Sequence, residues 1–186
     1  MQYYFMHINK TAGKSIERWF DINDSPIVGA KQDACQDIIR HFDDSGFYFT
    51  VVRNPYSRIV SQFVHWRDNL KRLREGVSFK DYILNLNNPN FFVQPKHLHK
   101  YQLRFHMPCS YWIRSERFKI FKFEDIEGFV EYFVNNFNFK DNFPCLNTTT
   151  KNDIMSYFDE ETIKIVNDIM LPDFQNFDYK IREAIK

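Results

Sequence analysis

The sequence predicts an α/β fold in which helices cover both faces of a mostly parallel central sheet. Three observations lead to this prediction. Strand-like apolar runs alternate with amphipathic helical segments through the first half of the chain. One run, residues 47–52, is almost continuously apolar, which is typical of a central strand buried on both faces. The chain has 186 residues, of which 44% are apolar, so we expect residues 1–186 to form one domain.

The first half of the chain is expected to alternate strands with helices. Strands are expected at residues 2–8, 26–29 and 47–52. Helices are expected at residues 15–20 and 33–42, where the apolar side chains fall on one face. A further helix should follow the third strand, because Asn54 can cap its first turn and Pro55 suits its first position.

The second half is expected to be more helical. Helices are expected at residues 78–86, 126–137 and 159–170, and one more strand at residues 118–123. Ser78 should cap the first of these helices, and Pro172 should end the last. Residues 85–106 are rich in Asn, Pro and His, and we expect a long functional loop with short helical pieces there.

The composition of the chain limits the kinds of partner and the cellular compartment that we expect. The net charge is +1, so no global field draws the chain to nucleic acid or to a membrane, and any anion site must be local. The three cysteines form no CxxC pair and predict a reduced protein without a disulfide framework. No signal or membrane segment is visible, so the chain as given is expected to be cytoplasmic, or a catalytic domain separated from an anchor.

The first candidate anion site connects the first strand to the first helix. It comprises Lys10, Thr11, Ala12, Gly13, Lys14 and Ser15. In a parallel sheet this connection lies at the carboxyl edge, where the N–H groups at a helix N-terminus bind anions. Glycine lets the backbone approach a phosphate closely, while the hydroxyls and lysines add donors and charge. We therefore expect a cradle for a 5′-phosphate group.

Residues 13–15 also resemble the end of the Walker phosphate loop. That pattern requires a glycine five residues before Gly13, and this position is Ile8, inside the strand. The loop is also too short to wrap a β-phosphate in the usual way. A P-loop-type kinase or NTPase is thus one alternative, and a plain strand-to-helix turn with solvated lysines is another.

The second candidate anion site follows the strand at residues 47–52. Arg53 ends this strand, and Ser57 and Ser61 lie four residues apart, on one helical face. The forked guanidinium of Arg53 and the hydroxyl of Ser61 suit a terminal phosphate monoester. Arg53 and Arg58 could instead be salt-bridge partners. Because both motifs follow core strands, they point to one sheet edge, where a ligand with two separated phosphates would satisfy both.

Both motifs resemble those of the PAPS-dependent, carbohydrate-type (family 2-like) sulfotransferases, where PAPS is 3′-phosphoadenosine 5′-phosphosulfate. The 5′-phosphosulfate loop of that family usually reads His-Ile-Pro-Lys-Thr-(Ala/Gly)-Gly-Thr-Ser, and it is similar to HINKTAGKS at residues 7–15. Residues 49–61 resemble the 3′-phosphate motif, in which Arg and Ser are eight residues apart. Weaker matches follow in order at residues 123–126, 146–151 and 173–179.

This resemblance implies a P-loop-NTPase-like sulfotransferase fold with three α/β/α layers, PAPS as donor, PAP as product and no metal. Lys10 would stabilise the leaving 5′-phosphate, Arg53 and Ser61 would hold the 3′-phosphate, and Thr149 or Lys151 would close the site. The acceptor would be a hydroxyl or amine, with a carbohydrate as the class implied by the family.

The general base is not provided by the resemblance. Gln32 occupies the position where some relatives hold a catalytic His, and an amide cannot take a proton at neutral pH. Candidate bases are Asp33, beside that position, and His41, near the end of the expected helix. A non-catalytic nucleotide-binding protein, which would keep both phosphate sites and lack a base, is therefore the second alternative.

Acceptor contacts are expected elsewhere in the chain. His97, His99 and His106 lie in the expected long loop, where such contacts would fall. A sugar site could be lined by Trp66, Arg67, Trp112 and Arg114, although packing is the commoner role of such side chains.

Overall fold

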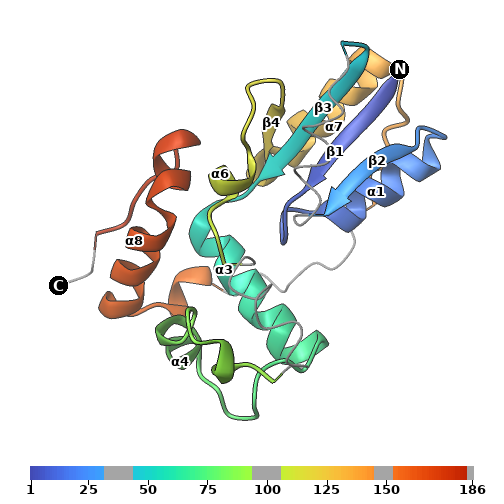
Figure 1. Cartoon of the computed structure of the whole chain (residues 1–186). Coiled ribbons are helices and arrows are strands. Elements are labelled where there is room, and N and C mark those ends of the chain that lie inside the picture. Colours follow the sequence, from blue (N-terminus) through green and yellow to red (C-terminus); the bar gives the residue numbers. More distant parts are fainter. Residues whose placement is uncertain (32–43, 94–105, 145–152, 184–186) are drawn as a thin grey trace. The chain divides into compact units, whose positions relative to one another are not determined.

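A computed structural model describes residues 1–31, 44–93, 106–144 and 153–183 (Figure 1). The chain divides into two compact units. The first contains Met1–Arg53 and Trp112–Thr148, and the second contains Asn54–Tyr111 and Thr149–Lys186. Each unit has its own cluster of buried apolar side chains.

The first unit is built on a four-stranded parallel sheet. Its strands are β1 (Gln2–His7), β2 (Ile27–Lys31), β3 (Gly46–Val52) and β4 (Lys119–Lys122), in the order β2-β1-β3-β4. Phe5 of β1 lies opposite Gly29 of β2 on one side and Phe49 of β3 on the other. The predicted parallel sheet is confirmed, with strand ends within two residues of those expected.

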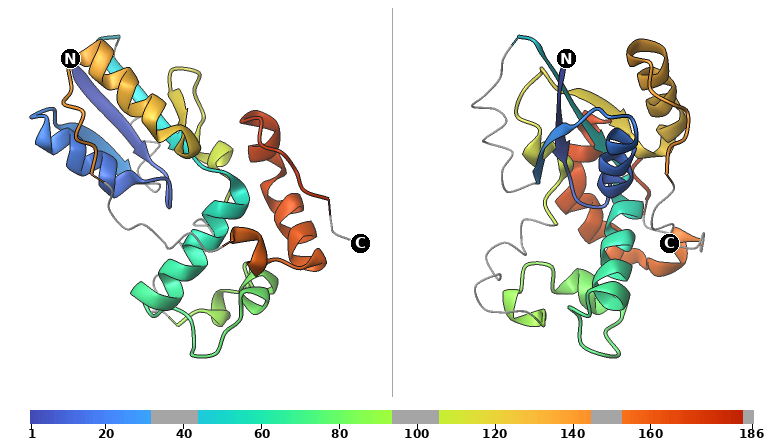
Figure 2. Two further views of the ribbon diagram at one scale, coloured as in Figure 1. Left: turned by 180° about the vertical axis from the view of Figure 1, so that it is seen from behind. Right: turned by 90° about the vertical axis from the view of Figure 1, so that its right-hand side faces the viewer.

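Two helices of this unit pack on the same face of the sheet. They are α1 (Gly13–Ile22) and α7 (Ile126–Phe137), and Figure 2 shows both on one side of the strands. Trp19 of α1 contacts Phe129 and Phe133 of α7 at ring-centre distances of 5.8 and 6.0 Å. Phe49 lies beneath, 5.3 Å from Phe20. Some of the 21 phenylalanines of the chain thus form an aromatic layer between sheet and helices, and others lie in the core of the second unit.

The opposite face of the sheet is buried in its two central strands. Met6, Tyr48 and Thr50 project to that face, and each is less than 5% exposed. Burial on both faces accounts for the continuous apolar run of β3. The fold is therefore the predicted class, a parallel α/β sheet with helices around it, consistent with three α/β/α layers. The helix expected at residues 33–42 lies outside the described residues.

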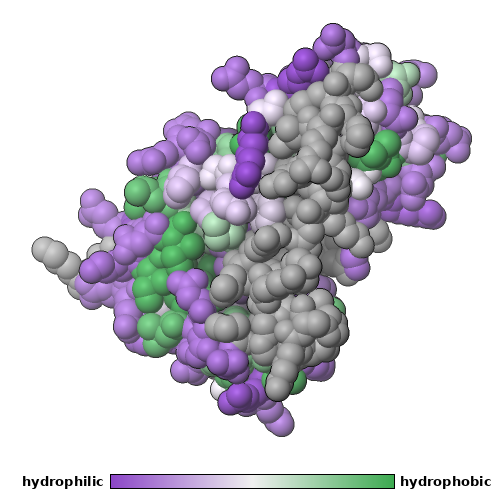
Figure 3. Space-filling model, viewed as in Figure 1, coloured by the Kyte–Doolittle hydropathy of each residue, from purple (hydrophilic) through white to green (hydrophobic). Residues whose placement is uncertain are grey.

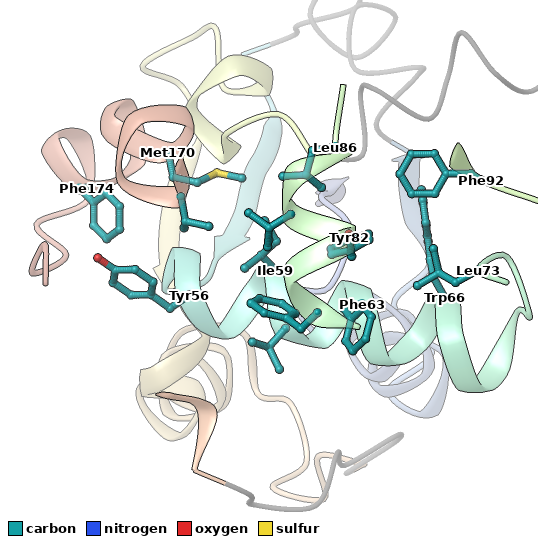
Figure 4. Close-up of a cluster of buried hydrophobic side chains, with 14 residues drawn as sticks. Tyr56, Ile59, Phe63, Trp66, Leu73, Tyr82, Leu86, Phe92, Met170 and Phe174 are labelled. Carbon is teal, nitrogen blue, oxygen red and sulfur yellow. The ribbon is translucent and has the colours of Figure 1, made fainter. Parts of the chain in front are cut away.

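The second unit is helical. Its longer elements are α3 (Pro55–Val64), a π-helical turn η2 (His65–Asn69), α4 (Phe79–Leu84) and α8 (Glu160–Asn176). Its shorter elements are η3 (Pro89–Phe91), η6 (Ile154–Tyr157) and α6 (Cys109–Trp112). The last residue of α6 belongs to the first unit, which also contains η5 (Phe123–Asp125). The core side chains of α3, α4 and α8 meet in Figure 4, where Trp66 packs edge-on against Phe92 at 5.1 Å.

Both helix caps predicted from the sequence are confirmed. The Asn54 side chain accepts hydrogen bonds from the backbone N–H groups of Tyr56 and Ser57, and Pro55 begins α3. Ser78 and Asp81 form a reciprocal capping box at the start of α4. These local signals set the start of each helix before any tertiary contact is considered.

The predicted end of the last helix is wrong. α8 continues through Pro172 to Asn176, although an interior proline costs a helix roughly 3 kcal/mol. Tertiary contacts beyond the proline offset this cost. The buried Asp173 carboxylate accepts hydrogen bonds from Cys109 N and Ser110 N at 2.7 and 2.8 Å, and Phe174 is buried in the core. The helix continues past Pro172 because the hydrogen bonds of Asp173 and the burial of Phe174 stabilise its last turn.

Apolar surface gathers over α8. Figure 3 shows a hydrophobic patch there, and Leu171 of this helix is 41% exposed. None of the helices that the structure describes is both long enough and apolar enough to cross a membrane. On its other side α8 contributes Val166, Met170 and Phe174 to the core of the second unit.

Candidate anion-binding site

Three segments that are distant in the sequence meet at the carboxyl edge of the sheet in the first unit. Lys10 follows β1, Arg53 follows β3 and Phe123 follows β4. The Arg53 guanidinium donates a hydrogen bond from Nη1 to the Lys10 carbonyl at 3.2 Å. It also lies over the Phe123 ring, 4.2 Å from the ring centre. The Lys10 turn and Arg53 therefore lie side by side, as the parallel sheet predicts.

The turn after β1 has an unusual backbone. Lys10 and Ala12 have φ angles of 67° and 68°, in the left-handed region that residues other than glycine seldom occupy. The buried Thr11 side chain holds the turn by donating its hydroxyl hydrogen to the Ile8 carbonyl at 2.8 Å. Alternation of left- and right-handed residues turns successive N–H groups toward one point, which makes a concavity for an anion. Such strain is typical of functional sites.

The start of α1 adds to this concavity. Its N-cap residue, Ala12, has no side-chain oxygen, and the first turn carries no acidic residue. The positive end of the helix dipole is therefore not neutralised by a capping side chain. An external anion can take the place of that cap.

Gly13 is required by the close approach of His7. A Cβ atom at position 13 would lie 2.0 Å from the His7 Nε2 atom. His7 Nδ1 is in turn 2.8 Å from the Glu17 carboxylate, one turn further along α1. The His7 ring is thus held between Glu17 and the backbone of the turn. The sequence alone does not predict this pair, since its only signal there is the position of His7 at the end of β1.

We predict that Gly13→Ala weakens anion binding through this clash. The added methyl group must push the His7 ring or the turn aside, so affinity for adenosine 3′,5′-bisphosphate (PAP), the ligand that the resemblance implies, should fall about tenfold or more, measured by calorimetry. The double variant Gly13→Ala/His7→Ala should recover part of this loss. Gly29→Ala is the matched control, because a Cβ there meets nothing within 4 Å. Equal affinity for Gly13→Ala and the wild type would contradict the assigned role.

The Lys10 ammonium has a lower pKa than an ordinary lysine. Burial, followed by repulsion from Arg53 and Lys14, lowers the pKa of the Lys10 ammonium to about 8. Three cations close together destabilise one another in the free protein, and an anion relieves that repulsion. Lys10, Lys14 and Arg53 are thus arranged for a ligand with more than one negative charge.

The remaining predicted site residues lie elsewhere or are not described. Ser61 is a buried residue of α3 in the second unit. Trp66 and Trp112 are buried, 1% and 6% exposed, and Trp66 packs in the core of the second unit. Several predicted residues lie outside the described ranges: Gln32, Asp33, His41, His97, His99, Thr149 and Lys151. Among the described residues, no group of three or more His, Cys, Asp or Glu side chains could hold a metal ion.

Comparison with known protein families gives a match over most of the chain. A sequence profile described as the sulfotransferase family matches residues 3–180. The chain belongs to the sulfotransferase family. No curated protein and no solved structure gives a significant match. The protein is accordingly a transferase whose general reaction is the transfer of a sulfuryl group.

The family match includes the residues of the candidate site. It begins in β1 and ends after α8, so it includes the Lys10 turn, Arg53 and Phe123 of this sulfotransferase. The contact of Arg53 with the Lys10 carbonyl is therefore internal to the matched region. Within the first unit the turn of the first motif is in contact with Arg53 of the second motif, while Ser57 and Ser61 of that motif belong to the second unit.

Proposed function

We propose that this sulfotransferase takes the sulfuryl group from PAPS and transfers it to a hydroxyl or amine of an acceptor, with a carbohydrate as the acceptor class. The observation that carries the proposal is the hydrogen bond from Arg53 to the Lys10 carbonyl, which joins the two phosphate motifs at one edge of the sheet. The family match runs through both compact units, which supports the proposal that residues 1–186 act as one domain.

The residues of the edge fit such a donor. Lysine, arginine and uncapped helix N–H groups are the donors that phosphate groups prefer, and the left-handed turn at Lys10 and Ala12 directs backbone N–H groups to one point. PAPS supplies the activated sulfuryl group. The 5′-phosphate would lie on residues 10–15, and Arg53 together with Ser61 would hold the 3′-phosphate.

Lys10 is proposed to stabilise the charge that develops on the leaving 5′-phosphate. Sulfuryl transfer resembles phosphoryl transfer in requiring in-line geometry and charge stabilisation at the leaving oxygen. The Lys10 ammonium and the α1 N-terminus are positioned by the turn before the reaction, so little reorganisation is needed. The stacking of the Arg53 guanidinium on Phe123 would fix the other end of the nucleotide in the same way.

The general base is proposed to be Asp33 or His41, and Thr149 or Lys151 is proposed to close the site over the donor. Proton removal from the acceptor by such a base contributes typically 10²- to 10⁴-fold. If Asp33 is the base, the rate of Asp33→Asn should no longer fall at low pH. If His41 is the base, the rate of His41→Ala should show this change instead. Unchanged profiles for both variants would reject both assignments.

Nucleotide preference tests the donor site. Calorimetry should show that PAP binds without a metal ion and at least tenfold more tightly than ATP with Mg²⁺. Preference for Mg²⁺-ATP would favour the kinase or NTPase alternative. Transfer of radiolabelled sulfate from PAPS to a panel of glycans should then yield a labelled product. Tight PAP binding without transfer to any acceptor would favour the non-catalytic alternative, toward which Gln32 also points.

We predict that PAP affinity falls as pH rises through about 8. The pKa of Lys10 is lowered to about 8, so its ammonium is mostly charged at pH 7 and mostly neutral at pH 9.5. A lost charge-assisted hydrogen bond should weaken PAP binding about tenfold over this range, measured by titration calorimetry at constant ionic strength. Lys10→Arg should give a flatter profile, because a guanidinium stays charged. A wild-type profile no steeper than that of Lys10→Arg would argue against Lys10.

A further inference from the structure

The Lys10 turn is flanked by a polar pair that the proposed reaction does not use. His7 is the last residue of β1, and Glu17 lies in the second turn of α1. The His7 Nδ1 atom is 2.8 Å from the Glu17 carboxylate. Because residues 8–16 run between these two side chains, their hydrogen bond connects the strand to the helix across the whole turn.

The His7 ring has three close neighbours. The Phe5 ring stacks on it, with ring centres 5.7 Å apart and ring planes inclined by 18°. Gly13 and Glu17 are four residues apart on α1, so both face the ring from one side of that helix. The Nε2 atom lies against Gly13, where a Cβ atom would come within 2.0 Å of it. The ring therefore fills the space between the end of β1 and the start of α1, and the His7 side chain is only 16% exposed.

The hydrogen bond to Glu17 sets the orientation of the ring. An ionised carboxylate only accepts hydrogen bonds, so His7 Nδ1 carries a hydrogen and donates it to Glu17. Hydrogen bonds to a carboxylate are among the stronger ones in proteins. The bond favours the ring orientation that places Nε2 at Gly13. Carboxylates orient functional histidines in the same way in catalytic triads and in metal sites.

The pair acts on the part of the turn that other side chains leave unsupported. Two residues of the turn have a left-handed backbone, which is unfavourable for residues other than glycine. The Thr11 hydroxyl and the Arg53 guanidinium hold the first part of the turn by donating to backbone carbonyls. The His7 ring contacts the other end, at Gly13, where α1 begins. The ring is therefore placed to fix the first N–H groups of this helix.

We propose that His7 and Glu17 together are positioning residues of the donor site. Glu17 orients the imidazole, the imidazole sets the place of Gly13, and Gly13 determines where the N–H groups at the start of α1 meet the 5′-phosphate. This role rests on the proposed binding of PAPS at residues 10–15. Donors that stabilise charge must be held in place, and a displacement of about 1 Å can cost on the order of 10²-fold in rate.

Replacement of Glu17 tests this role, because charge and position predict opposite results. Glu17 is an anion close to the turn, so by charge alone its removal should strengthen the binding of PAP. If Glu17 positions His7, Glu17→Ala should instead weaken PAP binding about fivefold, measured by calorimetry. Glu17→Gln should recover most of this loss, because its amide oxygen still accepts from Nδ1. Glu131→Ala, which removes an exposed carboxylate of α7 in the same unit, should bind PAP like the wild type.

Replacement of His7 tests whether the two residues act as one unit. His7→Ala should weaken PAP binding about tenfold, and the double variant with Glu17→Ala should bind no more weakly than His7→Ala alone. The titrations are made at a temperature where every variant is folded, so a loss of stability alone would leave the affinity unchanged. A nitrogen-15 spectrum of the imidazole should show the hydrogen of His7 on Nδ1 in the wild type, and this fixed tautomer should be lost in Glu17→Ala.

Three outcomes contradict the proposal in different ways. PAP affinity of Glu17→Ala equal to or higher than that of the wild type would overturn the positioning role. A wild-type spectrum in which His7 Nδ1 lacks the hydrogen would do the same. Absence of PAP binding by the wild type would reject the nucleotide site itself and this role with it, so the two failures can be told apart.

Discussion

Replacement of Arg53 by alanine should weaken binding of PAP at least tenfold and lower transfer from PAPS accordingly. The side chain connects the ends of three strands, since it donates to the Lys10 carbonyl and lies over the Phe123 ring. Its removal takes away the forked donor that we propose for the 3′-phosphate and one tether of the Lys10 turn. Calorimetric titration with PAP measures the loss. Arg53→Lys should be only partly active, because an ammonium cannot reproduce the fork.

The matched control for Arg53 is Arg18→Ala. Arg18 is an exposed residue of α1 in the same unit, and its removal lowers the net charge equally. We expect PAP affinity close to that of the wild type. An equal loss in both variants would show that general charge, rather than the position of Arg53, determines binding. Unchanged affinity of Arg53→Ala would falsify the assigned nucleotide site.

Replacement of Lys10 by alanine should reduce the rate of transfer about 10²- to 10³-fold at saturating donor. This is the usual effect of removing one preorganised donor that stabilises developing charge. The ammonium, crowded by Arg53 and Lys14, is expected to interact most strongly with the leaving phosphate. Single-turnover transfer measured with a saturating concentration of PAPS separates this rate effect from weaker binding.

Two measurements distinguish a catalytic defect of Lys10→Ala from misfolding and from a general loss of charge. The far-ultraviolet circular dichroism of the variant should match that of the wild type, because the Lys10 turn is held by Thr11 and the Lys10 carbonyl is retained. Lys164→Ala, which removes an exposed lysine of α8, should transfer at the normal rate. Near-normal turnover of Lys10→Ala would remove this residue from the mechanism.

Local sequence patterns were sufficient to predict most elements. The apolar run of β3, the cap at Asn54 and the cap at Ser78 act through neighbours within a few residues, so they can be read without knowledge of the fold. The end of α8 could not be read in this way. Pro172 is a local signal for the end of a helix. Asp173 and Phe174 nevertheless remain helical because they contact residues that are distant in the sequence.

The candidate site was predictable in composition and in its place at the sheet edge. A glycine, two lysines and an arginine after core strands of a parallel sheet must face one edge, because all such strands end there. The packing of His7 on Gly13 and of Arg53 on Phe123 was not predictable, because side-chain directions depend on how the strands twist and how α1 leaves its turn.

The amino-acid sequence by itself determined the α/β class, the strand order along the chain, the helix starts and the identity of the cationic groups. These features follow from periodicity and from hydrogen bonds between near neighbours. Only the tertiary structure decided which of these groups touch one another, which charges are buried and what their pKa values become. Contacts such as that of Arg53 with the Lys10 carbonyl connect residues 43 positions apart, and their formation depends on the packing of whole strands and helices.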